Sequence, residues 1–196
     1  MQFTSNELYF LINQHHFPLW LAGADLAEAN LARTNLTEAN LFGANLTGVN
    51  LSEADLTRAN LTGATLTRAI LYKAILTGAV LTRATLTRAI LYKADLTGAV
   101  LTKAILNRAV LTGANLSAAD LSKADLKEAK MSGVDLTGAK LRDVDLSCTN
   151  LNGAKMVGAD LTGANMSGTT LKGARYNELT KWPFDFSKGI ELILEP

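Results

Sequence analysis

The chain has 196 residues, of which 48% are hydrophobic, with a formal net charge of +1 and a single cysteine. This length suits one domain, no apolar run is long enough to cross a bilayer, and one cysteine excludes an internal disulfide. The amino terminus lacks the basic, apolar and cleavage segments of a secretory signal, so we expect a soluble, cytoplasmic protein.

Residues 1–20 precede a repeat that fills most of the chain. Thr4 and Glu7 have the spacing of a helix capping box, and apolar residues follow at helical intervals. The sequence therefore predicts a short helix that caps one end of the repeat. His15 and His16 are the only histidines, and no nearby cysteine or spaced carboxylate completes a metal site, so no metal is expected.

An apolar residue recurs at every fifth position from Leu21 to Leu171 without an insertion. The 31 centres are 28 leucines and three methionines, and alanine usually stands two residues before a centre. A period of five fits neither an α-helix, where it would spread leucines over every face, nor a straight strand, where successive leucines would point to opposite faces. We therefore expect the chain to turn once per pentad, with alanine and leucine inside and the residue between them outside.

The corner is expected two residues after each centre, where 14 of the 15 glycines occur. Glycine supplies the positive φ that the third residue of a type II turn requires. Corners that carry Arg, Lys or Glu are expected to use a turn with ordinary φ instead.

The length of one coil follows from an internal duplication. Residues 61–80 and residues 81–100 are identical at 18 of 20 positions. Duplication by whole coils keeps every column of side chains in register, so a 20-residue unit predicts a four-sided coil of four pentads.

Segments such as 24–26 (Ala-Asp-Leu), 29–31 and 44–46 (both Ala-Asn-Leu) resemble the pentapeptide-repeat family, whose pattern is Ala-(Asp/Asn)-Leu-x-x. The repeats resemble those of cyanobacterial members and cover about four fifths of the chain. The resemblance implies an all-β solenoid, a right-handed quadrilateral β-helix of about eight four-sided coils over residues 21–176, with a narrow core of Leu and Ala.

Charge is distributed unevenly along this repeat. Residues 1–55 carry a net charge of −5, residues 56–110 carry +7, and residues 111–196 carry −1. The near-neutral total therefore conceals a central excess of cations. We call the eight cations of the middle segment the basic belt: Arg58, Arg68, Lys73, Arg83, Arg88, Lys93, Lys103 and Arg108.

In the same segment, β-branched residues replace most of the outward Asp and Asn. With a 20-residue coil, some of them form a column beside two stacked tyrosines, with basic corners on both sides. We call this set the central stripe: Ile70, Tyr72, Ile90, Tyr92 and Val110, with Arg68, Arg88, Lys73 and Lys93 on its flanks. Exposed apolar surface rimmed by arginine is typical of a protein-contact site, so the stripe is the candidate partner-binding surface. The alternative is that β-branched and aromatic residues merely form ladders with their own kind.

Residues 177–196 follow Tyr176 and are rich in apolar side chains, which predicts a second cap. The segment 174–183 resembles the closing segment of many cyanobacterial members of the family. The resemblance implies a homodimer contact through this C-terminal tail as the alternative to a pure cap.

No phosphate-binding loop, dinucleotide fingerprint, zinc spacing or nucleophile elbow occurs in the sequence. A rod has no deep pocket in which to desolvate a catalytic group, so neither enzyme activity nor a cofactor is expected. The expected function is that of a non-enzymatic structural or protein-interaction rod.

The alternative is a DNA-mimicking regulator of a type II topoisomerase, a role known within the family. Mimicry requires a duplex-like negative surface, which the basic belt contradicts. Direct nucleic-acid binding lacks a recognised fold or aromatic platform in this sequence, so a protein is the expected partner.

Overall fold

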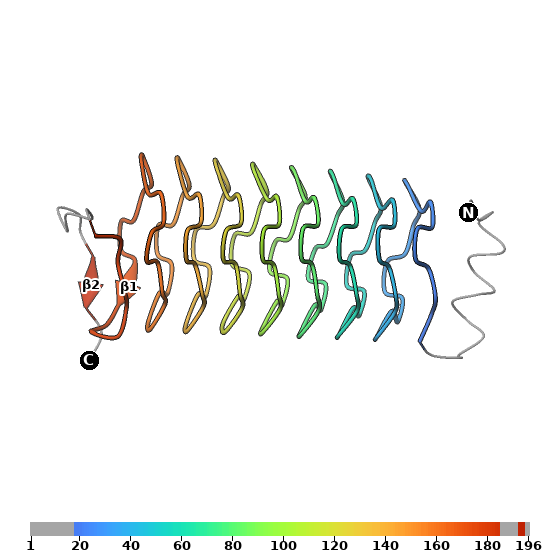
Figure 1. Cartoon of the computed structure of the whole chain (residues 1–196), viewed down its shortest axis with the longest axis horizontal. Coiled ribbons are helices and arrows are strands. Elements are labelled where there is room, and N and C mark those ends of the chain that lie inside the picture. Colours follow the sequence, from blue (N-terminus) through green and yellow to red (C-terminus); the bar gives the residue numbers. More distant parts are fainter. Residues whose placement is uncertain (1–17, 185–191, 195–196) are drawn as a thin grey trace.

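The computed structural model describes residues 18–184 and 192–194. The chain winds into a rod of stacked coils, along which the sequence runs from one end to the other (Figure 1). Parallel bridges join each outward residue to the residue 20 positions on, from Trp20 with Asn40 to Lys155 with Arg175. One coil therefore contains four pentads, as the duplication predicted.

Each side of a coil is too short to form more than one bridge with the coil above it. The two longer strands are β1 (Arg175–Tyr176) and β2 (Ile193–Leu194), which pair in parallel at the C-terminal end (Figure 1). The predicted N-terminal helix falls in residues 1–17, outside the described residues. Within the described ranges, no helix is long and apolar enough to span a membrane.

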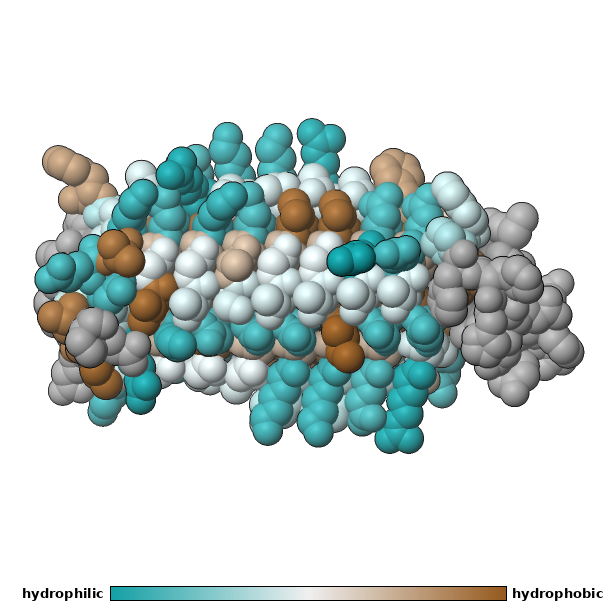
Figure 2. Space-filling view, turned by 90° about the horizontal axis from the view of Figure 1, so that it is seen from below, coloured by the Kyte–Doolittle hydropathy of each residue, from teal (hydrophilic) through white to brown (hydrophobic). Residues whose placement is uncertain are grey.

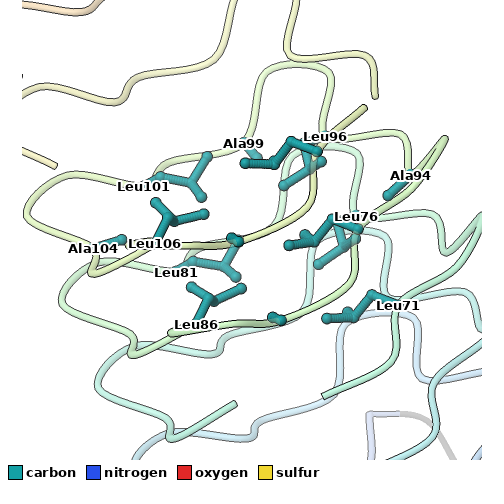
Figure 3. Close-up of a cluster of buried hydrophobic side chains, with 14 of the residues drawn as sticks. Leu71, Leu76, Leu81, Leu86, Ala94, Leu96, Ala99, Leu101, Ala104 and Leu106 are labelled. Atoms are coloured by element: carbon teal, nitrogen blue, oxygen red, sulfur yellow. The ribbon is translucent and has the colours of Figure 1, made fainter. Parts of the chain in front are cut away.

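The core is a stack of inward leucines with alanines between them. Every centre from Leu21 to Leu171 is buried except Met166, which is half-buried. Figure 3 shows leucines of successive coils, such as Leu81 and Leu101, pointing into the same interior. Where threonine replaces an inward alanine, its hydroxyl finds an acceptor: Thr149 Oγ1 donates to the Leu126 carbonyl at 2.7 Å. The inward assignment of both positions is therefore confirmed.

All 31 corner residues have positive φ, including 17 that are not glycine. The expectation of a second corner type with ordinary φ is wrong. The reason is the ladder: the corner N–H donates to a carbonyl of the next coil, at 2.9 Å for Gly63 and 3.0 Å for Arg83, to Thr82 and Thr102 respectively. A corner of different geometry would turn this N–H away, so arginine accepts the left-handed conformation.

The outward Asp and Asn residues stabilise the corner that follows them. A side-chain oxygen accepts a hydrogen bond from the backbone N–H two residues on, as Asp55 does from Thr57 at 2.9 Å and Asp95 from Thr97 at 3.0 Å. This is an Asx turn. In the pentads that carry Asp or Asn, it satisfies the one N–H that neither the ladder nor the turn uses.

Candidate functional site

The residues of the central stripe lie together on one side of the rod. Ile70 bridges to Ile90 and Ile90 to Val110, and the two isoleucine side chains are 37% and 40% exposed. The rings of Tyr72 and Tyr92 stack with centroids 5.9 Å apart and 6° between their planes. The predicted column and its tyrosine neighbours therefore form one continuous surface.

The ammonium groups of two lysines lie close to the rings of the tyrosine stack. Lys73 Nζ lies 5.3 Å from the centroid of the Tyr72 ring, and Lys93 Nζ lies 5.4 Å from that of Tyr92. Both are cation–π contacts. The lysines are thus held against the tyrosine rings, and the apolar stripe has positive charge directly at its edge.

On the opposite side of the stripe, three arginines occupy successive coils of one corner column. Arg108 Nε donates to Glu128 Oε2 at 2.8 Å, and this hydrogen bond raises the pKa of Arg108 and lowers that of Glu128. Within residues 18–184, neither Arg68 nor Arg88 forms an ion pair with a carboxylate. These two arginines are exposed.

Ion pairs elsewhere join neighbouring coils and are concentrated away from the middle of the rod. Arg33 pairs with Glu53 at 3.0 Å near one end, and Lys155 pairs with Asp135 at 3.8 Å toward the other. In the basic belt, only Arg58 and Arg108 pair with a carboxylate of the described part of the chain. Unneutralised positive charge is therefore localised in the central coils.

Exposed aliphatic residues extend beyond the stripe to the neighbouring faces. Ile75 is 41% exposed and Ile105 is 39% exposed, on the two sides adjoining the Ile70 column. Figure 2 shows one side of the rod, with a pale band along its axis, hydrophilic side chains projecting at both edges, and small separate hydrophobic patches. The apolar surface of the central coils is thus spread over several sides.

A shallow groove of about 470 Å³ adjoins the stripe and was not singled out from the sequence. It follows the corner column of Arg68, Arg88 and Arg108, and the residues before them, Thr67 and Thr87, also line it. The sequence contained a signal for this groove. Thr65 and Thr85, two positions before Thr67 and Thr87, stand where the repeat has Asp or Asn.

In the part of the chain that the structure describes, no three His, Cys, Asp or Glu residues gather as a metal site. Cys148 is exposed at a corner with a φ of 57°. His15 and His16 lie outside the described residues.

The C-terminal end of the rod carries a separate group of apolar side chains. Leu179 is 72% exposed and Leu194, on strand β2, is 60% exposed, and Phe184 is fully exposed. Tyr176 and Trp182 make an edge-to-face contact with ring centroids 5.6 Å apart. The residues of the predicted cap that are described therefore combine packed and exposed aromatic groups.

A search against family models matches "Pentapeptide repeats" in eight copies, over residues 21–143 and 145–175. A search of curated proteins finds no match. Among solved structures, HetL of the cyanobacterium Nostoc sp. strain PCC 7120, involved in regulating heterocyst differentiation, is 33% identical, with 89% of this chain and 94% of HetL aligned and a TM-score of 0.48.

Two further solved structures illustrate the range of relatives. The pentapeptide repeat protein alr5209 of Nostoc PCC 7120 is 36% identical over 52% of this chain and 84% of its own, with a TM-score of 0.51. QnrB1, a plasmid-mediated fluoroquinolone resistance protein, is 18% identical over 82% of this chain and 86% of its own, with a TM-score of 0.44.

The family match spans the same residues whose leucines form the core and whose corners turn every five positions. Members of this family form right-handed quadrilateral β-helices, and the 20-residue spacing of the bridges is that of a four-sided coil. The chain belongs to the pentapeptide-repeat family.

Proposed function

We propose that this protein is a non-enzymatic interaction rod that binds a protein partner through the central stripe. The observation that carries the proposal is the combination of exposed Ile70 and Ile90 with a stacked tyrosine pair, flanked by arginines that pair with no carboxylate in the described residues. Tyrosine and arginine are the residue types that dominate binding energy in protein interfaces.

The alternative, in which the stripe residues only form ladders between coils, explains the positive charges of the flanking arginines less well. Arg68 and Arg88 stand about one strand spacing, roughly 4.8 Å, apart at successive corners, where like charges repel each other. Some corner columns relieve such contacts with an acidic residue in the neighbouring coil, as Glu53 does for Arg33 and Glu128 does for Arg108. A partner that supplies acidic groups would provide this relief at Arg68 and Arg88.

The competing explanation is that the tyrosines only stabilise the rod. Their parallel stacking and the lysine ammonium groups over both rings are contacts that a purely structural ladder also makes. The two explanations differ in what removal of the rings changes.

The test is the double variant Tyr72→Ala with Tyr92→Ala, measured for both melting temperature and affinity for a partner captured from the native host. We expect loss of binding by about tenfold or more, because truncating an interface anchor typically costs about 2 kcal/mol, with a melting temperature close to that of the parent. A matched control is Thr82→Ala with Thr102→Ala, which removes a stacked hydroxyl pair at another corner. An unchanged affinity with a lowered melting temperature would assign the tyrosines to structure alone.

A DNA-mimicking role is the second candidate class, and the charge of the central coils disfavours it. The unneutralised cations of the basic belt lie where a mimic of duplex phosphates would carry acidic groups.

A homodimer contact at the C-terminal tail is supported by a different observation. Leu179, Phe184 and Leu194 are exposed residues that follow Tyr176 in the chain, and Leu194 belongs to strand β2 at the C-terminal end of the rod (Figure 1). Light scattering of the parent protein and of the Leu194→Asp variant, which gives the molar mass of each in solution, tests this contact. Equal masses for the two proteins would exclude a dimer through this residue.

A further inference from the structure

Three backbone N–H groups that line the groove beside the stripe lack an acceptor among the described residues. On this side of the rod, Thr47 N donates to Asn45 Oδ1 at 3.2 Å, and Lys127 N donates to Asp125 Oδ1 at 3.0 Å. The three coils between them carry Thr65, Thr85 and Ile105 at the position of the Asx residue. Within the described ranges, the N–H groups that follow, of Thr67, Thr87 and Asn107, consequently donate to no protein oxygen.

These three N–H groups belong to the residues that line the arginine groove. Thr67 precedes Arg68, Thr87 precedes Arg88, and Asn107 precedes Arg108, and the pocket of about 470 Å³ includes all six residues. Each coil thus contributes one free N–H and one guanidinium. The threonine hydroxyls of Thr67 and Thr87 also form no hydrogen bond in the described part of the molecule. The column is a repeated set of donors.

One acidic side chain of the rod itself shows which ligand this column accepts. Glu128 lies at the end of the groove and receives two hydrogen bonds from Arg108, at 2.8 Å and 3.4 Å. This is the forked pairing of a guanidinium with a carboxylate. In the two preceding coils, Arg88 and Arg68 stand at the same corner without a carboxylate.

The chemistry of the side chain already bound in this column favours a peptide. Glu128 shows that a guanidinium of the column binds a carboxylate in forked geometry, and an acidic peptide supplies carboxylates on its side chains, whereas a phosphodiester chain does not. Asn107, which lines the groove, also has a buried Oδ1 without a hydrogen-bond partner among the described residues. The groove therefore fits an acidic peptide.

We propose that this groove binds an extended, acidic segment of a protein partner, whose carboxylates pair with Arg68 and Arg88 and accept hydrogen bonds from the Thr67 and Thr87 N–H groups. The inference rests on the proposed function and names the chemistry of the partner. Adjacent coils are about 4.8 Å apart, and carboxylates at positions i and i+2 of an extended segment are about 7 Å apart. The long Arg and Glu side chains take up this difference, so one segment reaches two coils at once.

The probe is a synthetic peptide of ten glutamates, titrated into the ¹⁵N-labelled full chain at low salt while backbone amide shifts are recorded. We expect saturable downfield proton shifts at Thr67, Thr87 and Asn107, because these N–H groups acquire a charged acceptor. Replacement of the central cation, in Arg88→Gln, should weaken binding by about tenfold, since hydrogen bonds to charged groups contribute about 1.5 kcal/mol or more.

A charge-neutral variant separates hydrogen bonding from general attraction. In Thr65→Asn with Thr85→Asn, the new side-chain oxygens should cap the Thr67 and Thr87 N–H groups, as Asn45 caps Thr47. We expect binding of the peptide to weaken by about tenfold although the net charge is unchanged. The matched control, Val80→Asn with Val100→Asn, introduces the same residues in the column of a neighbouring side and should leave affinity unchanged.

Several outcomes would overturn the proposal. Shifts spread evenly over the basic belt, or equal affinities for the capped variant and its control, would leave only non-specific attraction. Tighter binding of a thymidine oligonucleotide of equal charge would assign the groove to nucleic acid. The Tyr72→Ala with Tyr92→Ala variant should still bind the peptide, so failure of the stripe as a partner surface and failure of the groove give different results.

Discussion

The left-handed conformation at the corners is a property of single residues that the fold imposes regardless of residue type. Gly63 has a φ of 66° and Arg83 has a φ of 58° at equivalent positions of the duplicated coils. An L-residue in this region is strained by roughly 1–2 kcal/mol, whereas glycine is not, although glycine also gains conformational freedom in the unfolded chain. The duplicated coils thus contain a natural comparison of the two residues at one corner.

The exchange of these two residues should move stability in opposite directions. Arg83→Gly should raise the free energy of unfolding by up to about 1 kcal/mol, and Gly63→Arg should lower it by about 1 kcal/mol. A Cβ at Gly63 would meet no heavy atom within 4 Å, so a steric clash does not complicate the second variant. Urea denaturation of the two variants and the parent measures both changes, and shifts of the same sign would contradict the strain argument.

The inward leucine is the other residue on which the fold depends. Leu86 is completely buried, and Leu86→Asp would place a carboxylate in the leucine stack with no partner. We expect a loss of more than about 4 kcal/mol and an unfolded chain by circular dichroism. Thr87→Asp, one residue on and half-buried before the corner residue Arg88, should change stability by about 0.5 kcal/mol or less. A folded Leu86→Asp variant would contradict the core assignment.

At the scale of the coil, the uninterrupted spacing of 20 residues ends only at the C-terminal end. Asp160 bridges to Lys181, which is 21 positions on, whereas the preceding bridges join residues 20 apart. The inserted residue lies after Tyr176, where Thr180 takes the inward position and its hydroxyl donates to the Met156 carbonyl at 2.9 Å.

Asp160 ties this last coil to its neighbours and makes it sensitive to acid. Burial raises the pKa of Asp160, but hydrogen bonds from Thr162 and Arg142 outweigh it and hold the pKa at about 2, below its ordinary value of 3.8. The Asp160 carboxylate also lies 3.8 Å from Lys181 Nζ. Because the folded-state pKa is depressed, this stabilisation is fully present above the ordinary value and is lost as the pH falls toward 2.

Asp160→Asn should therefore lower the melting temperature at pH 5, with a difference from the parent that shrinks between pH 4 and pH 2. Thermal melts of both proteins across this range provide the measurement. Asp145→Asn, in the neighbouring column, serves as a control because it changes the same residue type nearby. A difference that stays constant down to pH 2 would show that the Asp160 charge contributes nothing.

At the scale of the whole molecule, charge is arranged along the rod, with an acidic N-terminal segment followed by the basic belt. Residues 1–55 carry −5 and residues 56–110 carry +7. In the acidic segment, Glu38 and Glu53 are paired with arginines, so less of that charge is available to a partner. The field of the rod is therefore dominated by the free cations of its middle coils.

A DNA-gyrase supercoiling assay tests whether the protein acts as a DNA mimic, a role that this charge distribution disfavours. We expect no inhibition at sub-micromolar protein, because a DNA-binding enzyme recognises a negative surface and the central coils present a positive one. The variant Arg68→Glu with Arg88→Glu serves as a control for the sign of the charge. Inhibition by the unmodified protein would instead support a role as a DNA-mimicking regulator of a type II topoisomerase.

The four-sided cross-section and the leucine core follow from the pattern of residues along the chain. A five-residue period that is incompatible with a straight helix or strand requires a corner in every pentad, and the duplicated 20 residues require four corners in a coil. Local patterning sufficed because each pentad repeats one environment, so the burial of Leu86 follows from the same rule as that of Leu26. The central stripe followed from the same arithmetic, since columns are set by the coil length.

The corner geometry and the groove, in contrast, depend on how neighbouring coils contact each other. Local preference predicts ordinary φ for arginine, but the corner N–H of Arg83 must reach the Thr102 carbonyl of the next coil, and this hydrogen bond outweighs the preference. The N–H groups of Thr67 and Thr87 are identified as free in the described chain only when the hydrogen bonds of the structure are assigned, because the ladder and the turn take up the other N–H groups of these two pentads. Hydrogen bonds between neighbouring coils do not follow from local propensity, and they decide the corner geometry.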